Sequence, residues 1–533
     1  MYTLKNKVRI VTAASLFDGH DAAINIMRRV MQSSGAEVIH LGHDRSVQDV
    51  VDCAIQEDAN SIAMTSYQGG HVEYLKYMHD LLKEKGCEHI KLFGGGGGVI
   101  LPEEIEDLHN YGITRIYSPD DGRALGLQGM INDLLKKCDY PTGANLTDEL
   151  KKLEQRDYKS IARIISAAEN FNEQNTNLLS DIEAKAKISN TPVLGITGTG
   201  GAGKSSLVDE LVRRFLIDFK DLPNGQAGKQ IAIISVDPSK RKTGGALLGD
   251  RIRMNAISHP RAYMRSLATR DDNTALSAYV QEAIDVCKAA GYDFVILESA
   301  GVGQSDASIL EYCDVSLYVM TPEYGAASQL EKINMLDYAD VICINKFDKA
   351  GALDALHDVR KQYKRNHNLF TAKDEDLPIV GSIAAQFNDA GINALFIKLM
   401  DKINEKLNVE FGDLTALRSI TTELSSKPSI IPPKRVRYLS EIADANRSYD
   451  AWVKEQSIIA TQLYQLSGVE KIAGLNQQGI ADAKKNLEEK LHPECKKLID
   501  NWNSTKEKYS KEFFEYQVRD KVIKQPLTSL SLS

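Results

Sequence analysis

A glycine-rich segment that ends in lysine and serine has the residue types and spacing to hold a chain of phosphates. It reads Gly-Thr-Gly-Gly-Ala-Gly-Lys-Ser over residues 198–205. Glycines let the backbone curl so that several N–H groups point at one anion, while the lysine reaches the outer phosphates and the serine hydroxyl binds Mg²⁺. An apolar run at 193–196 predicts a buried strand before it, and a helical segment follows, whose N-terminus favours an anion. We predict a nucleoside triphosphate site formed by Gly201, Ala202, Gly203, Lys204, Ser205 and Ser206.

A second polar cluster indicates which base the nucleotide carries. The apolar run 341–344 ends in Asn345, Lys346, Phe347 and Asp348. A carboxylate at Asp348 accepts from both the ring N–H and the exocyclic amine of guanine. Adenine has no such pair of donors and would leave the carboxylate unpaired, which selects against ATP. The sequence therefore predicts GTP as the nucleotide.

Acidic residues end two further predicted strands, where phosphate-binding enzymes hold the water shell of a magnesium ion. Asp237 ends the run 231–236, and Glu298 ends the run 294–297. The predicted Mg²⁺ set is Ser205, Val236, Asp237, Asp250, Glu298 and Ser299. Lys204, Asp250 and Glu298 are the candidate catalytic residues, Arg253 is a candidate phosphate contact, and Gln304 is a candidate for positioning the attacking water.

Three of these segments carry a family resemblance. Val-Asp-Pro-Ser (236–239), Gly-Gly-x-Leu-Leu-Gly-Asp (244–250) and Glu-Ser-x-Gly-Val-Gly-Gln-Ser (298–305) resemble the GTPase chaperones that service adenosylcobalamin-dependent acyl-CoA mutases. The resemblance covers residues 190 to 410 and implies a cobalamin-binding partner.

The N-terminal segment resembles such a partner. Asp18-Gly19-His20-Asp21 lies between a predicted strand at 8–13 and a predicted helix at 22–32, and it is similar to the Asp-x-His-x-x-Gly motif of cobalamin-binding domains. The resemblance implies that His20 ligates cobalt in place of the cofactor's own benzimidazole, while Asp18 holds the other ring nitrogen. Ala23 departs from the final glycine of that motif.

Two further segments match the same family in order. Thr65 and Ser66 follow a predicted strand at 61–65 and keep the hydroxyl of the family's Ser-x-Leu pattern, although Tyr67 replaces the leucine. Five glycines follow the run 90–93, and their missing side chains leave room for the displaced nucleotide tail. The predicted cobalamin-binding residues are Asp18, Gly19, His20, Asp21, Thr65, Ser66, Gly94, Gly95, Gly96, Gly97 and Gly98.

These segments must be positioned by an α/β fold with parallel sheets. Strands at 8–13, 37–41, 61–65, 90–93 and 114–117 predict a five-stranded, flavodoxin-like (Rossmann-like) sheet, whose carboxyl edge would carry the cobalamin residues. We predict a cobalamin-binding domain (1–140), a helical linker (141–190), a P-loop GTPase domain (191–412) and a helical C-terminal arm (413–533).

A cobalamin domain followed by this GTPase resembles the acyl-CoA mutases with a built-in GTPase chaperone. That resemblance implies reversible interconversion of isobutyryl-CoA and n-butyryl-CoA, with adenosylcobalamin, GTP and Mg²⁺ as cofactors and a homodimer as the assembly. In that family a barrel of about 250 residues binds the acyl-CoA substrate. No barrel-like repeat follows residue 412, so we expect the barrel to lie outside this chain and mutase activity to be incomplete in it.

Two other functions remain open at this point. One is a stand-alone GTPase metallochaperone that delivers adenosylcobalamin to a separate mutase subunit. The other is a cobalamin methyltransferase module, which would share the His20 loop but has no use for the GTPase segments.

Composition limits the class of partner. The 533 residues carry a net charge of −8 and are 43% hydrophobic, so we expect neither a nucleic-acid nor a membrane surface. Seven cysteines lie without Cys-x-x-Cys spacing, which is typical of thiols in a reducing cytoplasm. No signal-like apolar segment opens the sequence.

Overall fold

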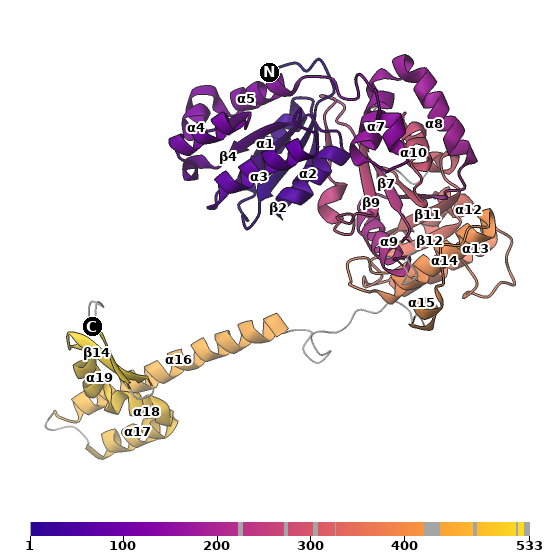
Figure 1. The fold of residues 1–533 in the computed structure, drawn as a ribbon. Coiled ribbons are helices and arrows are strands. Elements are labelled where there is room, and N and C mark those ends of the chain that lie inside the picture. Colours follow the sequence, from indigo (N-terminus) through magenta and orange to yellow (C-terminus); the bar gives the residue numbers. More distant parts are fainter. Residues whose placement is uncertain are drawn as a thin grey trace. The chain divides into compact units, whose positions relative to one another are not determined.

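The computed structural model describes residues 2–221, 227–270, 275–301, 307–325, 327–420, 438–472, 477–518 and 521–526. The chain divides into two compact units, residues 1–427 and 428–533 (Figure 1). The first unit holds both predicted binding domains, each built on its own parallel sheet.

The first sheet has six strands in the order β5-β4-β3-β1-β2-β8. Its first five strands are β1 (Arg9–Ser15), β2 (Glu37–Arg45), β3 (Ser61–Thr65), β4 (Lys91–Gly95) and β5 (Arg115–Tyr117). Its helices are α1 (Ala22–Ser33), α2 (Val47–Gln56), α3 (His71–Glu84), α4 (Pro102–Tyr111) and α5 (Pro119–Cys138), with a 3₁₀ turn η1 (Gly97–Val99) after β4. One apolar layer joins α2, α3 and α4 to the sheet, and another joins α1 and α5, so both faces are covered. The five predicted strands and the flavodoxin-like order are confirmed.

The sixth strand of this sheet comes from the second domain. β8 (Ala246–Leu248) pairs in parallel with β2, with Glu37 opposite Ala246 and Ile39 opposite Leu248. The prediction of a five-stranded sheet is therefore short by one strand. Its sixth member lies far along the chain, in a segment that the sequence pattern assigned to the nucleotide site.

The second sheet is wholly parallel and has seven strands in the order β13-β12-β11-β6-β10-β7-β9. The strands are β6 (Val193–Gly198), β7 (Ile231–Asp237), β9 (Ala262–Ala268), β10 (Phe294–Glu298), β11 (Val315–Met320), β12 (Val341–Asn345) and β13 (Ile379–Ser382). The helices and 3₁₀ turns between the strands are α9 (Lys204–Asp218), η3 (Asp250–Arg253), α10 (Val280–Ala289), η4 (Ser308–Glu311), η5 (Pro322–Tyr324), α11 (Ala327–Leu330), α12 (Met335–Tyr338) and α13 (Ala352–Asn366). Two helices, α14 (Ala390–Leu407) and α15 (Thr415–Ile420), follow the last strand. The predicted phosphate loop leaves the carboxyl end of the central strand β6 and enters α9.

The segment between the two sheets is helical and well packed. It forms α6 (Glu149–Leu153), α7 (Tyr158–Phe171), the 3₁₀ turn η2 (Glu173–Asn175) and α8 (Thr176–Ile188). Buried apolar residues of α7, including Ile161 and Ile165, join the same core as β7, β10 and α10 of the second sheet. These helices therefore add a layer to the nucleotide-binding domain.

The C-terminal unit contains four helices and a hairpin among its described residues. They are α16 (Tyr438–Val469), α17 (Gln477–Lys490), α18 (Pro493–Asp500), α19 (Trp502–Tyr509), β14 (Phe513–Val518) and β15 (Lys521–Pro526). The helical character of this region is confirmed, but the predicted helical arm (413–533) also contains a β-hairpin that we did not predict. Phe513, Phe514 and Tyr516 favour an extended backbone. In the antiparallel hairpin they lie opposite Pro526, Gln525 and Ile523.

Within the described part of the chain, no helix is both long enough and apolar enough to cross a membrane.

Candidate functional site

The loop after β1 holds an aspartate–histidine pair in a defined geometry. His20 Nδ1 lies 2.8 Å from Asp18 Oδ1, and the same oxygen accepts the His20 backbone N–H at 2.9 Å. Asp18 is fully buried, whereas the His20 side chain is 66% exposed. Because an ionised carboxylate only accepts, the pair places the imidazole proton on Nδ1 and leaves Nε2 as a lone-pair donor. This is the state in which a histidine ligates a metal.

Asp18 is kept ionised by its neighbours. Burial raises the pKa of Asp18, but hydrogen bonds from the Tyr67 backbone N–H and from His20 outweigh burial and hold that pKa below its usual range. The Tyr67 N–H donates to Asp18 Oδ2 at 2.6 Å, and the Tyr67 ring lies 5.9 Å from the His20 ring. The loop after β3 therefore helps to orient the loop after β1.

The glycine run after β4 lies against the same loop. A Cβ on Gly96 would come within 2.0 Å of the Ser66 carbonyl oxygen, so a side chain at this position would push the two loops apart. The Ser66 hydroxyl is occupied, since it accepts from Ser15 Oγ at 2.8 Å. Thr65 Oγ1, in contrast, is buried and has no hydrogen-bond partner among the described residues. An orphaned buried hydroxyl beside a set of glycines fits a site built to receive a polar ligand.

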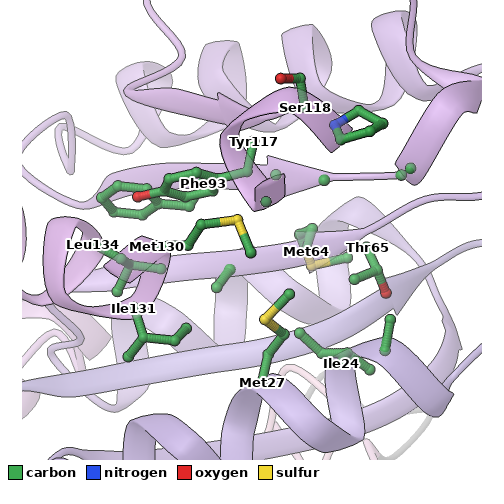
Figure 2. Close-up of a pocket in the computed structure, with 18 of the residues that line it drawn as sticks. Ile24, Met27, Met64, Thr65, Phe93, Tyr117, Ser118, Met130, Ile131 and Leu134 are labelled. Atoms are coloured by element: carbon green, nitrogen blue, oxygen red, sulfur yellow. The ribbon is translucent and has the colours of Figure 1, made fainter. Parts of the chain in front are cut away.

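Below these loops the sheet and two helices enclose an apolar slot of about 220 Å³ (Figure 2). Its walls are mostly hydrophobic, and Thr65 and Ser118 contribute hydroxyls near its rim. Its lining residues include Ala23, Ile24, Met27, Met64, Thr65, Phe93, Gly94, Gly95, Gly96, Gly97, Tyr117, Ser118, Met130, Ile131 and Leu134. A flat aromatic group with a polar attachment fits such a slot, as does the nucleotide tail of cobalamin. Sequence reasoning missed the wall from α5, because no motif marks Met130 or Leu134.

The remaining residues of the first predicted set have local roles. Asp21 precedes α1 and accepts from Asn25 Nδ2 at 3.0 Å, and Gly19 lies between Asp18 and His20 on the exposed loop. Gly98 lies in η1, where a Cβ would meet nothing within 4 Å.

The second site is centred on the phosphate loop. Lys204 is the first residue of α9, and its Nζ donates to the Gly198 carbonyl at 3.2 Å, back across the loop. Lys346 Nζ donates to the Gly201 carbonyl at 2.8 Å from the other side. The loop that would contain the phosphates thus lies between two lysines and the N-terminus of a 15-residue helix.

Ser205 brings the predicted metal residues together. Its Oγ lies 2.8 Å from Asp250 Oδ1 and 2.9 Å from Glu298 Oε1. One hydroxyl has a single proton and cannot donate to both carboxylates. Glu298 Oε2 is also buried without a hydrogen-bond partner among the described residues. Hydroxyl and carboxylate oxygens converging in this way fit Mg²⁺, either directly or through its water shell.

The electrostatics of this cluster favour binding of a cation. Burial and the neighbouring Asp250 raise the pKa of Asp237 to about 8 and raise the pKa of Glu298 well above its usual value. Burial lowers the pKa of Lys204. A bound divalent cation would offset the repulsion among these carboxylates.

Other predicted residues of the set lie in different surroundings. The Val236 side chain packs in the core, and Ser299 Oγ donates to Thr197 Oγ1 at 2.9 Å. Arg253 is exposed at the end of η3. Gln304 lies outside the described residues. A residue that we did not predict, Ser235, donates through Oγ to Asp250 Oδ2.

The loop after β12 contacts both the phosphate loop and β13. Asn345 is buried, donates through Nδ2 to the Ala202 carbonyl at 2.8 Å, and accepts the Ala384 N–H at 3.0 Å. Phe347 packs closely on Gly381, while Asp348 is exposed at the end of the loop. Asn345 therefore joins the loop after β12 to the phosphate loop and to the segment after β13.

Comparison with known proteins finds a family match for each of the two domains that carry these residues. Residues 8–120 match the B12 binding domain family, and residues 159–413 match the Methylmalonyl Co-A mutase-associated GTPase MeaB family. Over 100% of its length the chain is 53% identical to a fused isobutyryl-CoA mutase from Geobacillus kaustophilus (strain HTA426), of which it covers 49%. Similar proteins of the same name come from Cupriavidus metallidurans (49% identical over 99% of this chain and 48% of that protein) and Nocardia farcinica (47%, 99% and 48%).

Over essentially its whole length the chain is similar to fused isobutyryl-CoA mutases. It spans about half the length of the curated relatives that it matches. The two family matches confirm the predicted cobalamin and GTP cofactors, and Mg²⁺ is typical of such GTPases. The segment that this chain shares with the fused isobutyryl-CoA mutases therefore matches the B12 binding domain and MeaB families.

Proposed function

We propose that this chain is the cobalamin- and GTP-binding part of a radical acyl-CoA mutase that interconverts isobutyryl-CoA and n-butyryl-CoA. The observation that carries the proposal is the Asp18–His20 pair, which contacts Tyr67 in the lining of an apolar slot. The same compact unit contains a complete phosphate loop. The relatives that match the chain from end to end support the choice of substrate through their names.

Adenosylcobalamin supplies the radical chemistry when it is bound. The chain's own residues would bind and orient the cofactor and the nucleotide. His20 Nε2 would ligate the cobalt of the cofactor, Asp18 would keep that nitrogen basic, and the slot would bury the nucleotide tail away from water. At the second site Lys204 and Ser205 would hold GTP and its Mg²⁺, with Asp250 and Glu298 in the metal's shell. GTP binding and hydrolysis would then gate loading of the cofactor.

A stand-alone metallochaperone is less well supported, because the relatives matched over the whole chain are named mutases. We also propose that a barrel binds the acyl-CoA, that the assembly is a homodimer, and that the protein is cytoplasmic. The last point agrees with seven free cysteines and no disulfide among them.

The mutase proposal is tested with purified residues 1–533, adenosylcobalamin, GTP and isobutyryl-CoA. We expect n-butyryl-CoA only when a substrate-binding barrel is supplied, because radical chemistry requires a site closed to water. Gas chromatography of the hydrolysed acyl groups measures the conversion. Turnover by residues 1–533 alone would contradict the barrel requirement. Transfer of the cofactor away from this chain to the added subunit would favour the metallochaperone.

Guanine selectivity is tested by Asp348→Asn. Asparagine replaces one acceptor with an amide donor, which opposes the N–H groups of guanine but complements the extra carbonyl of xanthine. A good bidentate contact is worth about 1–3 kcal/mol, so kcat/KM for GTP should fall roughly tenfold while XTP gains. Asp354→Asn, on the exposed first turn of α13, is the matched control. Hydrolysis of ATP by the unmodified chain as readily as GTP would refute the guanine assignment.

A further inference from the structure

Two consecutive residues of the 3₁₀ turn η3 contact different domains. Asp250, its first residue, contacts the phosphate-loop Ser205 at 2.8 Å. Arg251, the next residue, is 5% exposed and contacts the cobalamin-binding domain. Its Nε donates to Glu57 Oε1 at 2.7 Å and its Nη2 donates to Gln56 Oε1 at 2.8 Å. Adjacent residues of one turn thus join the predicted metal site to the end of α2.

Glu57 is a rigid anchor for this arginine. Its side chain is fully buried at the C-terminus of α2. Besides Arg251, its carboxylate accepts the Ser266 hydroxyl at 2.9 Å and the Ser266 N–H at 3.1 Å, both from β9. It also lies 3.4 Å from Arg9 of β1. A buried carboxylate with this many partners has no alternative position that would satisfy them all.

The segment before η3 is fixed as well. β8 adds to the cobalamin sheet beside β2, and a Cβ on Gly245 would come within 2.1 Å of the Gln32 carbonyl. The chain from Gly245 to Arg251 is therefore bound to the cobalamin domain at both ends, and Asp250 lies between the two attachments. Successive Cα atoms are about 3.8 Å apart, so a shift of Arg251 is transmitted to Asp250 directly.

We propose that Glu57, a residue of the cobalamin-binding domain, is a positioning residue of the GTPase site. Through Arg251 it holds Asp250 against Ser205 and thereby sets the Mg²⁺ affinity of the nucleotide site. The cobalamin domain thus supports metal binding at a site to which it contributes none of the predicted Mg²⁺ ligands. The inference rests on the proposed GTPase function.

The test is Glu57→Gln in the full 533-residue chain. Glutamine keeps the shape of the side chain but removes the charge that pairs with Arg251. Loss of an outer-shell partner typically lowers metal affinity 10–100-fold, so the Mg²⁺ concentration that half-saturates tightening of fluorescent mant-GDP binding should rise about tenfold. Affinity for mant-GDP in EDTA should stay within about twofold of the unmodified chain, since Lys204 and the loop amides are untouched. The Mg²⁺ midpoint of GTP hydrolysis should rise in parallel.

Arg270→Gln is the matched control. Arg270 also bridges the domains, with Nε 2.8 Å from Glu37 and Nη2 3.2 Å from Glu169, but it has no contact with η3 among the interactions described for it. Its loss should lower the melting temperature without moving the Mg²⁺ midpoint. Arg251→Lys serves as a second test if Glu57→Gln does not fold, and it should move the midpoint in the same direction.

The outcomes distinguish the positioning role of Glu57 from the proposed GTPase function. An equal shift of the midpoint in Glu57→Gln and Arg270→Gln would mean that general loosening of the domains is responsible, which overturns the proposal. An unchanged midpoint in Glu57→Gln would overturn it too. Failure of the unmodified chain to bind or hydrolyse GTP would refute the proposed function instead.

Discussion

Replacing His20 with alanine is expected to convert bound cobalamin from a histidine-ligated to a base-off spectrum. The imidazole held by Asp18 is the nitrogen donor placed beside the apolar slot, and alanine offers no substitute. We expect cofactor affinity to fall roughly 10–100-fold, the range found when metal-site partners are lost. Titration of adenosylcobalamin followed by absorbance measures both effects.

His43→Ala is the matched control for this experiment. His43 is also exposed and paired with a neighbouring aspartate, Asp44 at 3.0 Å, but it lies at the end of β2, outside the slot. Its replacement should leave the spectrum unchanged. A nitrogen superhyperfine pattern in the Co(II) paramagnetic spectrum that does not respond to isotopically labelled histidine would rule out ligation by His20.

Replacing Lys204 with alanine is expected to reduce kcat/KM for GTP at least 100-fold. The ammonium group lies at the N-terminus of α9, over the phosphate loop, and would stabilise the charge that develops on the transferred phosphoryl group. Loss of a single preorganised donor of this kind typically costs 10²–10³ in rate. Phosphate release under saturating Mg²⁺ measures the effect.

Lys361→Ala, on the exposed face of α13, should leave GTP hydrolysis unchanged. Normal hydrolysis by the Lys204 variant would remove the phosphate loop from the mechanism. Cobalamin binding by both variants should persist, since neither lysine lines the slot.

Much of the fold could be predicted because its signals are local. Buried parallel strands read as short apolar runs, and both sheets are built of such runs. The phosphate loop and the Asp18–His20 pair were predictable for the same reason: each motif lies within a few residues of the strand that positions it. Sequence spacing does not predict which side chains meet in space. The structure shows, for example, that the Ser205 hydroxyl lies within hydrogen-bond distance of both Asp250 and Glu298.

The features that escaped prediction depend on distant partners. The sequence Ala246-Leu247-Leu248 does not predict pairing with β2, because a short apolar run of this kind is equally compatible with a buried loop. Arg9 is a buried charge at the first position of β1, and it is tolerated because Glu37, Glu57 and Glu169 surround it from separate elements. The apolar slot also depends on residues that are distant in sequence, since its wall from α5 forms only when that helix packs against the sheet.

The pairing of β2 with β8 also bears on how the chain is synthesised. About 200 residues separate Arg45 from Ala246, so at 5–20 residues per second the partner of β2 reaches it roughly 10–40 s late. During that interval the backbone amides and carbonyls along one side of β2 have no strand to bond, which is the condition that invites pairing with another chain. A newly synthesised cobalamin-binding domain therefore has one unpaired sheet edge until β8 of the GTPase domain has been synthesised and pairs with β2. During this time the exposed edge of β2 is the part of the domain most open to pairing with another chain.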